Sequence, residues 1–190
     1  MTENSCDVAL KEWAVICRAL ETGQQTILLR KGGIAEGAGV FRPDHARFWL
    51  YPTQFHQTAE QVTSDLVPLL SETAELRTAA GDLVLRSVAV VEEVRYLTSI
   101  EQALALCGLH GWSEDVVRQR FAYRQPGLFL FVLRVFRSEI TNQVTESAEM
   151  AGCKSWVALP ISFPIGRSTP ALTSAAFDYA KQLIHSKLNS

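Results

Sequence analysis

The sequence predicts an α+β domain built on a mixed or antiparallel sheet, and three observations support this class. Short apolar runs rich in β-branched and aromatic residues alternate with amphipathic stretches along the chain. The first two apolar runs are joined by five residues, too few for the crossover that a parallel pair requires. With 190 residues, 47% of them hydrophobic, the chain can bury a core of its own. We expect an open or barrel-like sheet with several flanking helices and a docked C-terminal helix.

The N-terminal third is expected to contain a hairpin, a loop and an aromatic strand. Residues 13–20 and 26–30 are apolar runs on either side of a connection that contains Gly23, which predicts a β-hairpin. Residues 31–46 are rich in glycine, which predicts an exposed irregular loop. Residues 47–51 then form a short strand that Pro52 is expected to stop.

The sequence in the middle of the chain predicts several helices and two long strands. Apolar spacing over residues 58–70 indicates a helix that Pro68 kinks or ends. Residues 83–97 are β-rich but interrupted by charges, which predicts one bent strand or two strands joined by a bulge. Ser99 begins a capping-box helix over residues 100–106.

A second short helix is expected after Ser113, since acidic residues follow it at the positive end of the helix dipole. Residues 128–136 are apolar on both faces, which is typical of a central strand.

The C-terminal part predicts a strand over residues 154–159 that ends at Pro160, followed by a helix with one apolar face. The expected organisation is therefore a main domain over residues 1–160, a connecting passage over 161–172 and a helix over 173–190 that packs on the same domain.

Charge and cysteine content exclude several classes of protein. A net charge of −2 excludes a strongly basic protein that coats nucleic acid. The N-terminus has no basic segment before its apolar stretch, and no apolar run approaches the ~18 residues of a membrane span. We expect a cytoplasmic protein without a membrane partner. The four cysteines are expected to be reduced thiols, and we expect neither a metal nor a cofactor.

The segment Arg30, Lys31, Gly32 and Gly33 is a candidate anion site. Successive glycine amides can form a nest for a phosphate or carboxylate, and the two cations would neutralise it. The spacing matches neither a Walker A loop nor a dinucleotide fingerprint. The alternative is an ordinary solvated loop.

Two histidines are candidates for acid/base chemistry. His45 and His56 flank the aromatic strand, and a neutral imidazole can act as a base near neutral pH. The alternative is that each forms a local hydrogen bond. Cys107 and His110 have a metal-like spacing, but no second pair accompanies them.

Arginines and aromatic residues are interleaved in the second half of the chain. Arg120 and Arg124 are candidates for phosphate contacts, and Tyr123 or Trp49 is a candidate platform on which a base stacks. The alternative is that the arginines form only the polar face of a helix and a strand.

Four short runs carry a resemblance to a known family. They are LKEWAV at 10–15, LLRKGGI at 28–34, FWLYPTQFHQ at 48–57 and AGCKSWV at 151–157. In this order they resemble an uncharacterised bacterial family that is catalogued as domain of unknown function 1802. The resemblance covers residues 9 to about 160 and implies no particular activity.

A second, local resemblance covers less than a third of the chain. The runs GDLVL at 81–85, VEEV at 91–94 and TSIEQAL at 98–104 are similar to the β-barrel shared by pseudouridine-synthase-and-archaeosine-transglycosylase (PUA) and ASCH domains. Members of these families bind RNA, so this resemblance implies an RNA ligand.

The leading functional hypothesis is therefore a module that binds RNA or another nucleic acid. A second hypothesis is a small-molecule enzyme or sensor that binds an anionic ligand and uses His45 or His56 as acid/base. A third is an interaction protein without catalytic chemistry. The sequence makes no prediction of oligomeric state.

Overall fold

A computed structural model describes residues 5–31, 34–37, 40–43, 45–54, 57–152 and 154–189, with the backbone alone described at 34–37, 40–43, 74 and 75. The strands within these residues are β1 (Ser5–Trp13), β2 (Ile27–Arg30), β3 (Ile34–Gly37), β4 (Val40–Pro43), β5 (Arg47–Thr53), β6 (Leu83–Leu97), β7 (Leu128–Val144), β8 (Trp156–Pro164) and β9 (Ser168–Pro170). The α-helices of this described part are α1 (Ala14–Glu21), α2 (Leu69–Glu72), α3 (Ile100–Ala105), α4 (Glu114–Ala122), α5 (Ala148–Ala151) and α6 (Ser174–Leu188). Two 3₁₀ turns lie at Ala59–Gln61 and Thr73–Leu76.

The main sheet has the order β2-β7-β6-β5-β1-β8, and β9 pairs with β7. Strands β1 and β5 are parallel, and the other pairs are antiparallel. The predicted α+β class with a mixed sheet is confirmed. The sheet is open and not a closed barrel, because β2 and β8 form its edges.

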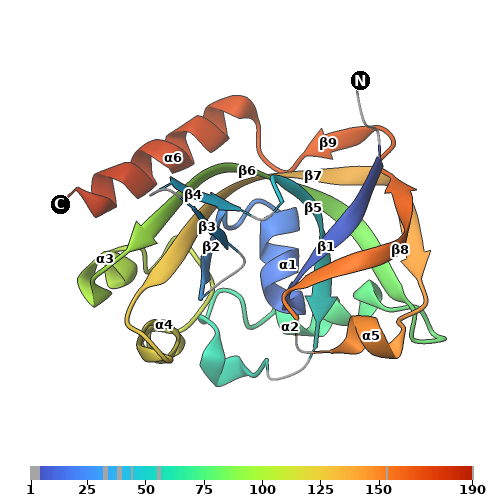
Figure 1. Cartoon of the computed structure of the whole chain (residues 1–190), viewed down its shortest axis with the longest axis horizontal. Coiled ribbons are helices and arrows are strands. Elements are labelled where there is room, and N and C mark those ends of the chain that lie inside the picture. Colours follow the sequence, from blue (N-terminus) through green and yellow to red (C-terminus); the bar gives the residue numbers. More distant parts are fainter. Residues whose placement is uncertain are drawn as a thin grey trace.

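The predicted N-terminal hairpin is wrong. The strand β1 ends at Trp13, and the apolar run that follows it is helix α1, of which all residues except Arg18 are buried. Figure 1 shows α1 inside the curve of the sheet. A short apolar run is difficult to assign by periodicity alone, and the helical pairing of Arg18 with Glu21 three positions later is the local sign of a helix here. Strand β2 therefore pairs with β7 and not with the preceding run.

Two further segments differ from expectation. Residues 31–46, expected to be an irregular loop, include the hairpin of β3 and β4. Residues 58–70, expected to be a helix, contain a 3₁₀ turn at Ala59–Gln61 and then further turns, and α2 begins only at Leu69. Here Val62 bridges to Trp112, so a long-range contact replaces the helical periodicity.

The long strands β6 and β7 form the centre of the fold. Their pairing shifts register between Leu85 and Ser87 and again between Val91 and Glu93, which confirms a bent strand with bulges. The predicted central strand is also confirmed, because β7 lies between β6 on one side and β2 and β9 on the other.

Local signals at the shorter helices were informative. Ser99 and Gln102 form both hydrogen bonds of the predicted capping box at α3. Helix α4 begins after Ser113 with two acidic residues in its first turn. In contrast, β8 continues through Pro160 to Pro164, and β9 follows, so residues 161–172 are not only a connecting passage.

The C-terminal helix α6 packs against the outer side of β6 and β7 (Figure 1). Phe177 and Ile184 are its buried residues, and Thr173 caps its first turn. His185 lies 2.7 Å from a carboxylate oxygen of Glu93 on β6, and this pairing lowers the pKa of Glu93 against the opposing effect of burial.

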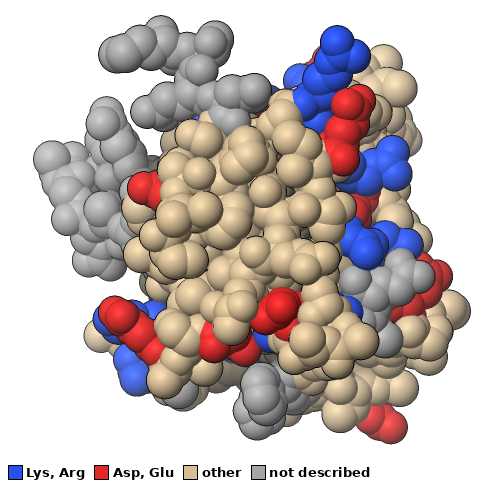
Figure 2. All heavy atoms as spheres, turned by 90° about the vertical axis from the view of Figure 1, so that its right-hand side faces the viewer, with Lys and Arg blue, Asp and Glu red and all other residues tan. Residues whose placement is uncertain are grey.

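The side of the molecule on which β8 lies carries little charge at its centre. Figure 2 shows this side with basic and acidic side chains around its margin, and β8 itself contains no charged residue. This face therefore offers no continuous basic surface to a polyanion. Among the described residues, no helix is both long and apolar enough to cross a bilayer.

Candidate nucleic-acid interface

The parallel pairing of β1 and β5 brings the carboxyl ends of two strands together, and a hollow opens there. Its volume is about 300 Å³, and we name it the Glu12 hollow. Its lining comes from β1, β2, β5, α4 and the residues directly after β2 and before β8: Lys11, Glu12, Trp13, Leu29, Arg30, Lys31, Thr53, Arg120 and Ser155. Trp13 at the end of β1 pairs with Thr53 at the end of β5, so the ends of these two strands lie side by side in the wall of the hollow.

Glu12 is a buried carboxylate that two guanidinium groups neutralise. One oxygen accepts hydrogen bonds from Arg30 Nη1 at 2.9 Å, and the other accepts from the backbone N–H of Trp13. Arg120 Nη2 lies 3.6 Å from the same carboxylate. Because a buried charge is costly without partners, this arrangement explains how an acidic residue remains in the core.

Burial lowers the pKa of the Arg30 guanidinium; Glu12 opposes this effect, and the positive charge of Arg120 adds to it. An arginine keeps its charge in proteins, so both guanidiniums remain cationic beside the hollow.

Arg120 is held between two indole rings. Its guanidinium carbon lies 5.0 Å from the ring centroid of Trp13 and 4.7 Å from that of Trp112. Its Nη1 also donates to the carbonyl of Leu29. Cation–π contacts on both sides keep this charge in a defined place.

Lys31 organises the turn that follows α4. Its Nζ donates to the carbonyls of Phe121 at 2.7 Å and Gly127 at 2.9 Å, and also to that of Gln125. Burial lowers the pKa of this amine. Lys31 therefore links the end of β2 to the turn that leads into β7.

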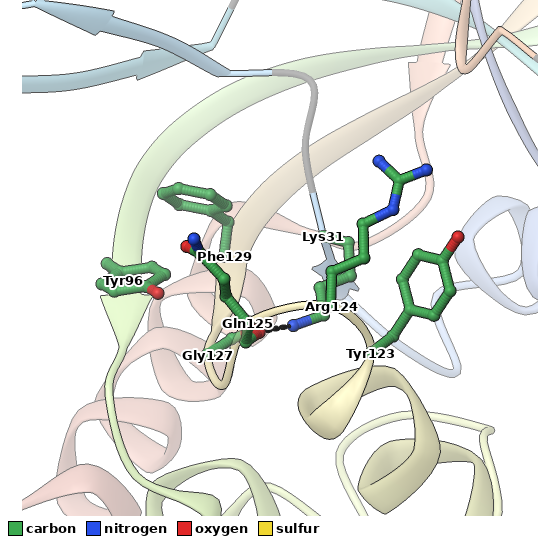
Figure 3. A pocket seen from close by; sticks show the side chains of 7 residues that line it. All are labelled: Lys31, Tyr96, Tyr123, Arg124, Gln125, Gly127 and Phe129. Carbon is green, nitrogen blue, oxygen red and sulfur yellow. Dashed lines mark hydrogen bonds between the residues drawn. The ribbon is translucent and has the colours of Figure 1, made fainter.

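A second hollow, of about 530 Å³, lies over this turn, and we name it the Tyr123 hollow. Its lining is Lys31, Tyr96, Tyr123, Arg124, Gln125, Gly127 and Phe129. Figure 3 shows Tyr96 and Phe129 on one side, Tyr123 and Arg124 on the other, and Lys31 between them. The hollow thus combines aromatic walls with cations, and Lys31 belongs to both hollows.

Tyr123 and Arg124 form the exposed rim of this hollow. Tyr123 is 57% exposed, and the Arg124 guanidinium carbon lies 5.1 Å from its ring centroid. Arg124 has a φ of 60°, a left-handed conformation that glycine or asparagine adopts more easily at the end of a helix. The folded protein is less stable with arginine at this position than with glycine or asparagine. The presence of Arg124 therefore points to a role outside folding.

The structure brings together five of the predicted site residues and separates others. Arg30, Lys31, Arg120, Tyr123 and Arg124 line the two connected hollows. Arg30 and Lys31, however, are held by Glu12 and by carbonyl groups, and are not free cations of a solvated loop.

Two of the remaining predicted residues, Trp49 and His45, do not line the two hollows. Trp49 is completely buried and donates from Nε1 to the carbonyl of Cys6, so its ring is not available to a base. His45 is exposed and lies edge-on to Trp156, 5.0 Å away between ring centroids, and it lines neither hollow. Gly32, Gly33 and His56 lie outside the described residues.

Cys107 and His110, whose spacing resembles that of a metal site, lie in the turn that follows α3. Within the described part of the chain, no group of three or more His, Cys, Asp or Glu side chains is placed to hold a metal ion.

Comparison with protein families matches residues 9–182 to the domain of unknown function DUF1802. The chain belongs to the DUF1802 family. The match extends beyond the expected limit near residue 160 and into α6. No curated protein matches the chain.

Solved structures of an ASCH protein from Zymomonas mobilis are similar to this DUF1802 chain. A single-residue mutant has 14% identity and a TM-score of 0.44, with 80% of this chain and 88% of that chain covered. The unmutated protein has 13% identity and a TM-score of 0.43, with 94% and 93% covered. At this level of similarity the likeness assigns neither ligand nor activity.

The four runs that carry the family resemblance meet at the Glu12 hollow. Residues 10–15 contribute Lys11, Glu12 and Trp13, and residues 28–34 contribute Leu29, Arg30 and Lys31. Residues 48–57 contribute Thr53, and residues 151–157 contribute Ser155.

Sequence reasoning missed Lys11, Glu12, Thr53 and Ser155 as site residues. The available signal was the charged pair Lys11 and Glu12 within an otherwise apolar stretch.

Proposed function

We propose that this DUF1802 protein binds single-stranded nucleic acid, with RNA as the ligand class, across the Tyr123 and Glu12 hollows. The observation that carries the proposal is the exposed Tyr123 ring beside Arg124, at the rim of an aromatic hollow that shares Lys31 with a cationic one. A single strand of nucleic acid needs both an aromatic and a cationic surface, since its bases stack on aromatic rings and its phosphates contact cations.

The charge distribution supports a local site. Lys11, Arg30, Lys31 and Arg120 line the same hollow as Glu12, so basic residues outnumber acidic ones in its described lining. The whole chain has a net charge of −2 and therefore lacks a general affinity for polyanions. Binding is expected to depend on a few contacts and to involve a short length of strand.

The stacking contact is tested by titrating labelled single-stranded RNA and following fluorescence anisotropy. Tyr123→Leu is expected to weaken binding by about 5- to 150-fold, the usual value of one base–aromatic stack, whereas Tyr123→Phe keeps the ring and the affinity. Tyr179→Leu is the matched control, because Tyr179 is 67% exposed on α6. Equal affinities for Tyr123→Leu and Tyr179→Leu would contradict the proposal.

The phosphate contacts are tested by the salt dependence of the same binding. Arg124→Asn removes a cation and suits the left-handed backbone, so it is expected to reduce the slope of log K against log salt by about 0.7 without loss of stability. Arg118→Gln is the control, since Arg118 is exposed and paired with Glu114. The difference in affinity between this RNA and single-stranded DNA of the same sequence measures the contribution of the 2′-hydroxyl groups. Absence of RNA binding at low salt would refute the proposed function.

A further inference from the structure

The Glu12 hollow has more positive charge than one phosphodiester requires. Its described lining contains four basic residues, and the carboxylate of Glu12 is already satisfied by Arg30, Arg120 and a backbone N–H. A phosphodiester carries one negative charge, whereas a terminal phosphate monoester carries about 1.5 to 2 at neutral pH. The excess of positive charge therefore favours the monoester.

Hydrogen-bond donors beside the hollow also fit such a group. The Nε–H of Arg30 is buried and has no hydrogen-bond partner among the described residues. Ser155 adds a hydroxyl to the lining. An unsatisfied buried donor is costly, and a phosphate oxygen that reached it after a small rotation of the Arg30 side chain would offset that cost. A phosphate monoester has three terminal oxygens that accept charge-assisted hydrogen bonds, one more than a diester has.

The two hollows lie next to each other, since Lys31 lines both. A base stacked on Tyr123 and a phosphate held in the Glu12 hollow would therefore lie on the two sides of Lys31, as neighbouring parts of one ligand. We infer that the Glu12 hollow binds a terminal phosphate monoester, so that the two hollows together hold a nucleoside monophosphate unit. This unit is either a free nucleotide or the phosphorylated end of a strand. The inference rests on the proposed function and adds the chemical class that the site prefers.

The test compares one single-stranded RNA sequence with a 5′-phosphate, with a 3′-phosphate and with hydroxyl ends, by fluorescence anisotropy on the full chain. One phosphorylated form is expected to bind at least about tenfold more tightly than the hydroxyl form. Free nucleoside monophosphates are tested in parallel against the corresponding nucleosides, by competition and by the fluorescence of Trp13 in the lining.

Variants separate the phosphate site from the stacking site. Lys11→Gln and Ser155→Ala are expected to remove most of the preference for the phosphorylated form, whereas the control Ser162→Ala, at an exposed position on β8, retains it. Tyr123→Leu is expected to weaken both forms equally and leave their ratio unchanged. A melting curve for each variant verifies that it is folded, and Ser155→Ala tests the site if Lys11→Gln does not fold.

Four outcomes are informative. A phosphate preference that Lys11→Gln or Ser155→Ala abolishes supports the inference and the proposed function together. RNA binding without regard to terminal phosphate, and without competition by nucleoside monophosphates, overturns the inference and leaves the proposed function standing. Binding of nucleoside monophosphates without RNA binding supports the inference for free nucleotides and refutes the proposed function. No binding of either ligand overturns both.

Discussion

His110 is expected to make the stability of this protein depend on pH. The residue is 4% exposed, and neither ring nitrogen has a hydrogen-bond partner among the described residues. Burial, reinforced by the positive charge of Arg120, lowers the pKa of His110 to about 4 from the ordinary value of 6.5. Between about pH 4 and about pH 6.5 the folded protein therefore holds a neutral imidazole, whereas His110 of the unfolded chain is mostly a cation.

The size and sign of the effect follow from these two pKa values. Between about pH 6.5 and about pH 4 the unfolded state binds a proton that the folded state does not, so stability falls as the pH falls through this range. At about 1.4 kcal/mol for each pH unit, the full contribution of His110 is about 3 kcal/mol. This stability is fully present above about pH 6.5 and is lost by about pH 4.

Urea unfolding of the parent protein and of His110→Leu, followed by tryptophan fluorescence across this pH range, measures the effect. Leucine fills a similar space and cannot titrate, so the difference between the two unfolding free energies should change by about 3 kcal/mol across the range. Contributions of the carboxylates cancel in this difference. A difference that is independent of pH would refute the reasoning, as would an NMR titration that gives His110 an ordinary pKa in the folded protein.

Two further predictions concern stability alone. Glu12→Gln leaves Arg30 and Arg120 without their buried counter-charge, so the free energy of unfolding in urea should fall by about 3 to 5 kcal/mol. The control Arg118→Gln breaks an exposed ion pair and should lower it by less than about 1 kcal/mol. Equal losses would mean that the Glu12 pairs are solvated. Phe177→Ala should lower the free energy of unfolding by about 3 to 5 kcal/mol, because this residue is 3% exposed and fixes α6 to the sheet. An unchanged melting temperature would contradict the docking of α6.

Elements with strong local signals could be predicted from the sequence. The long strand β6 with its bulges, the central strand β7, the capping box at Ser99 and the final helix α6 all follow from nearby residues. Each of these signals is local, since it depends on alternation, apolar runs or side chains three or four positions apart. Helix α1 was missed because its apolar run is short, and its local helical signal, the pair Arg18 and Glu21 three positions apart, did not outweigh the β-branched residues.

The candidate site likewise combines features that the local sequence predicts with features that it does not. The sequence by itself indicated Arg30, Lys31, Arg120, Tyr123 and Arg124 as cationic and aromatic candidates, because their side-chain chemistry is independent of the fold. It could not determine which of them would share a surface. Trp49 has the same chemistry as an exposed stacking residue but lies in the core.

Only the tertiary structure decided that Glu12 neutralises Arg30 and Arg120, and that Thr53 and Ser155 complete the hollow around them. These contacts depend on the parallel pairing of β1 with β5 and on the antiparallel return of β8, which join residues far apart in the chain. Pairing between distant strands is set by the total burial and hydrogen bonding of the sheet, and no local stretch of sequence contains that information.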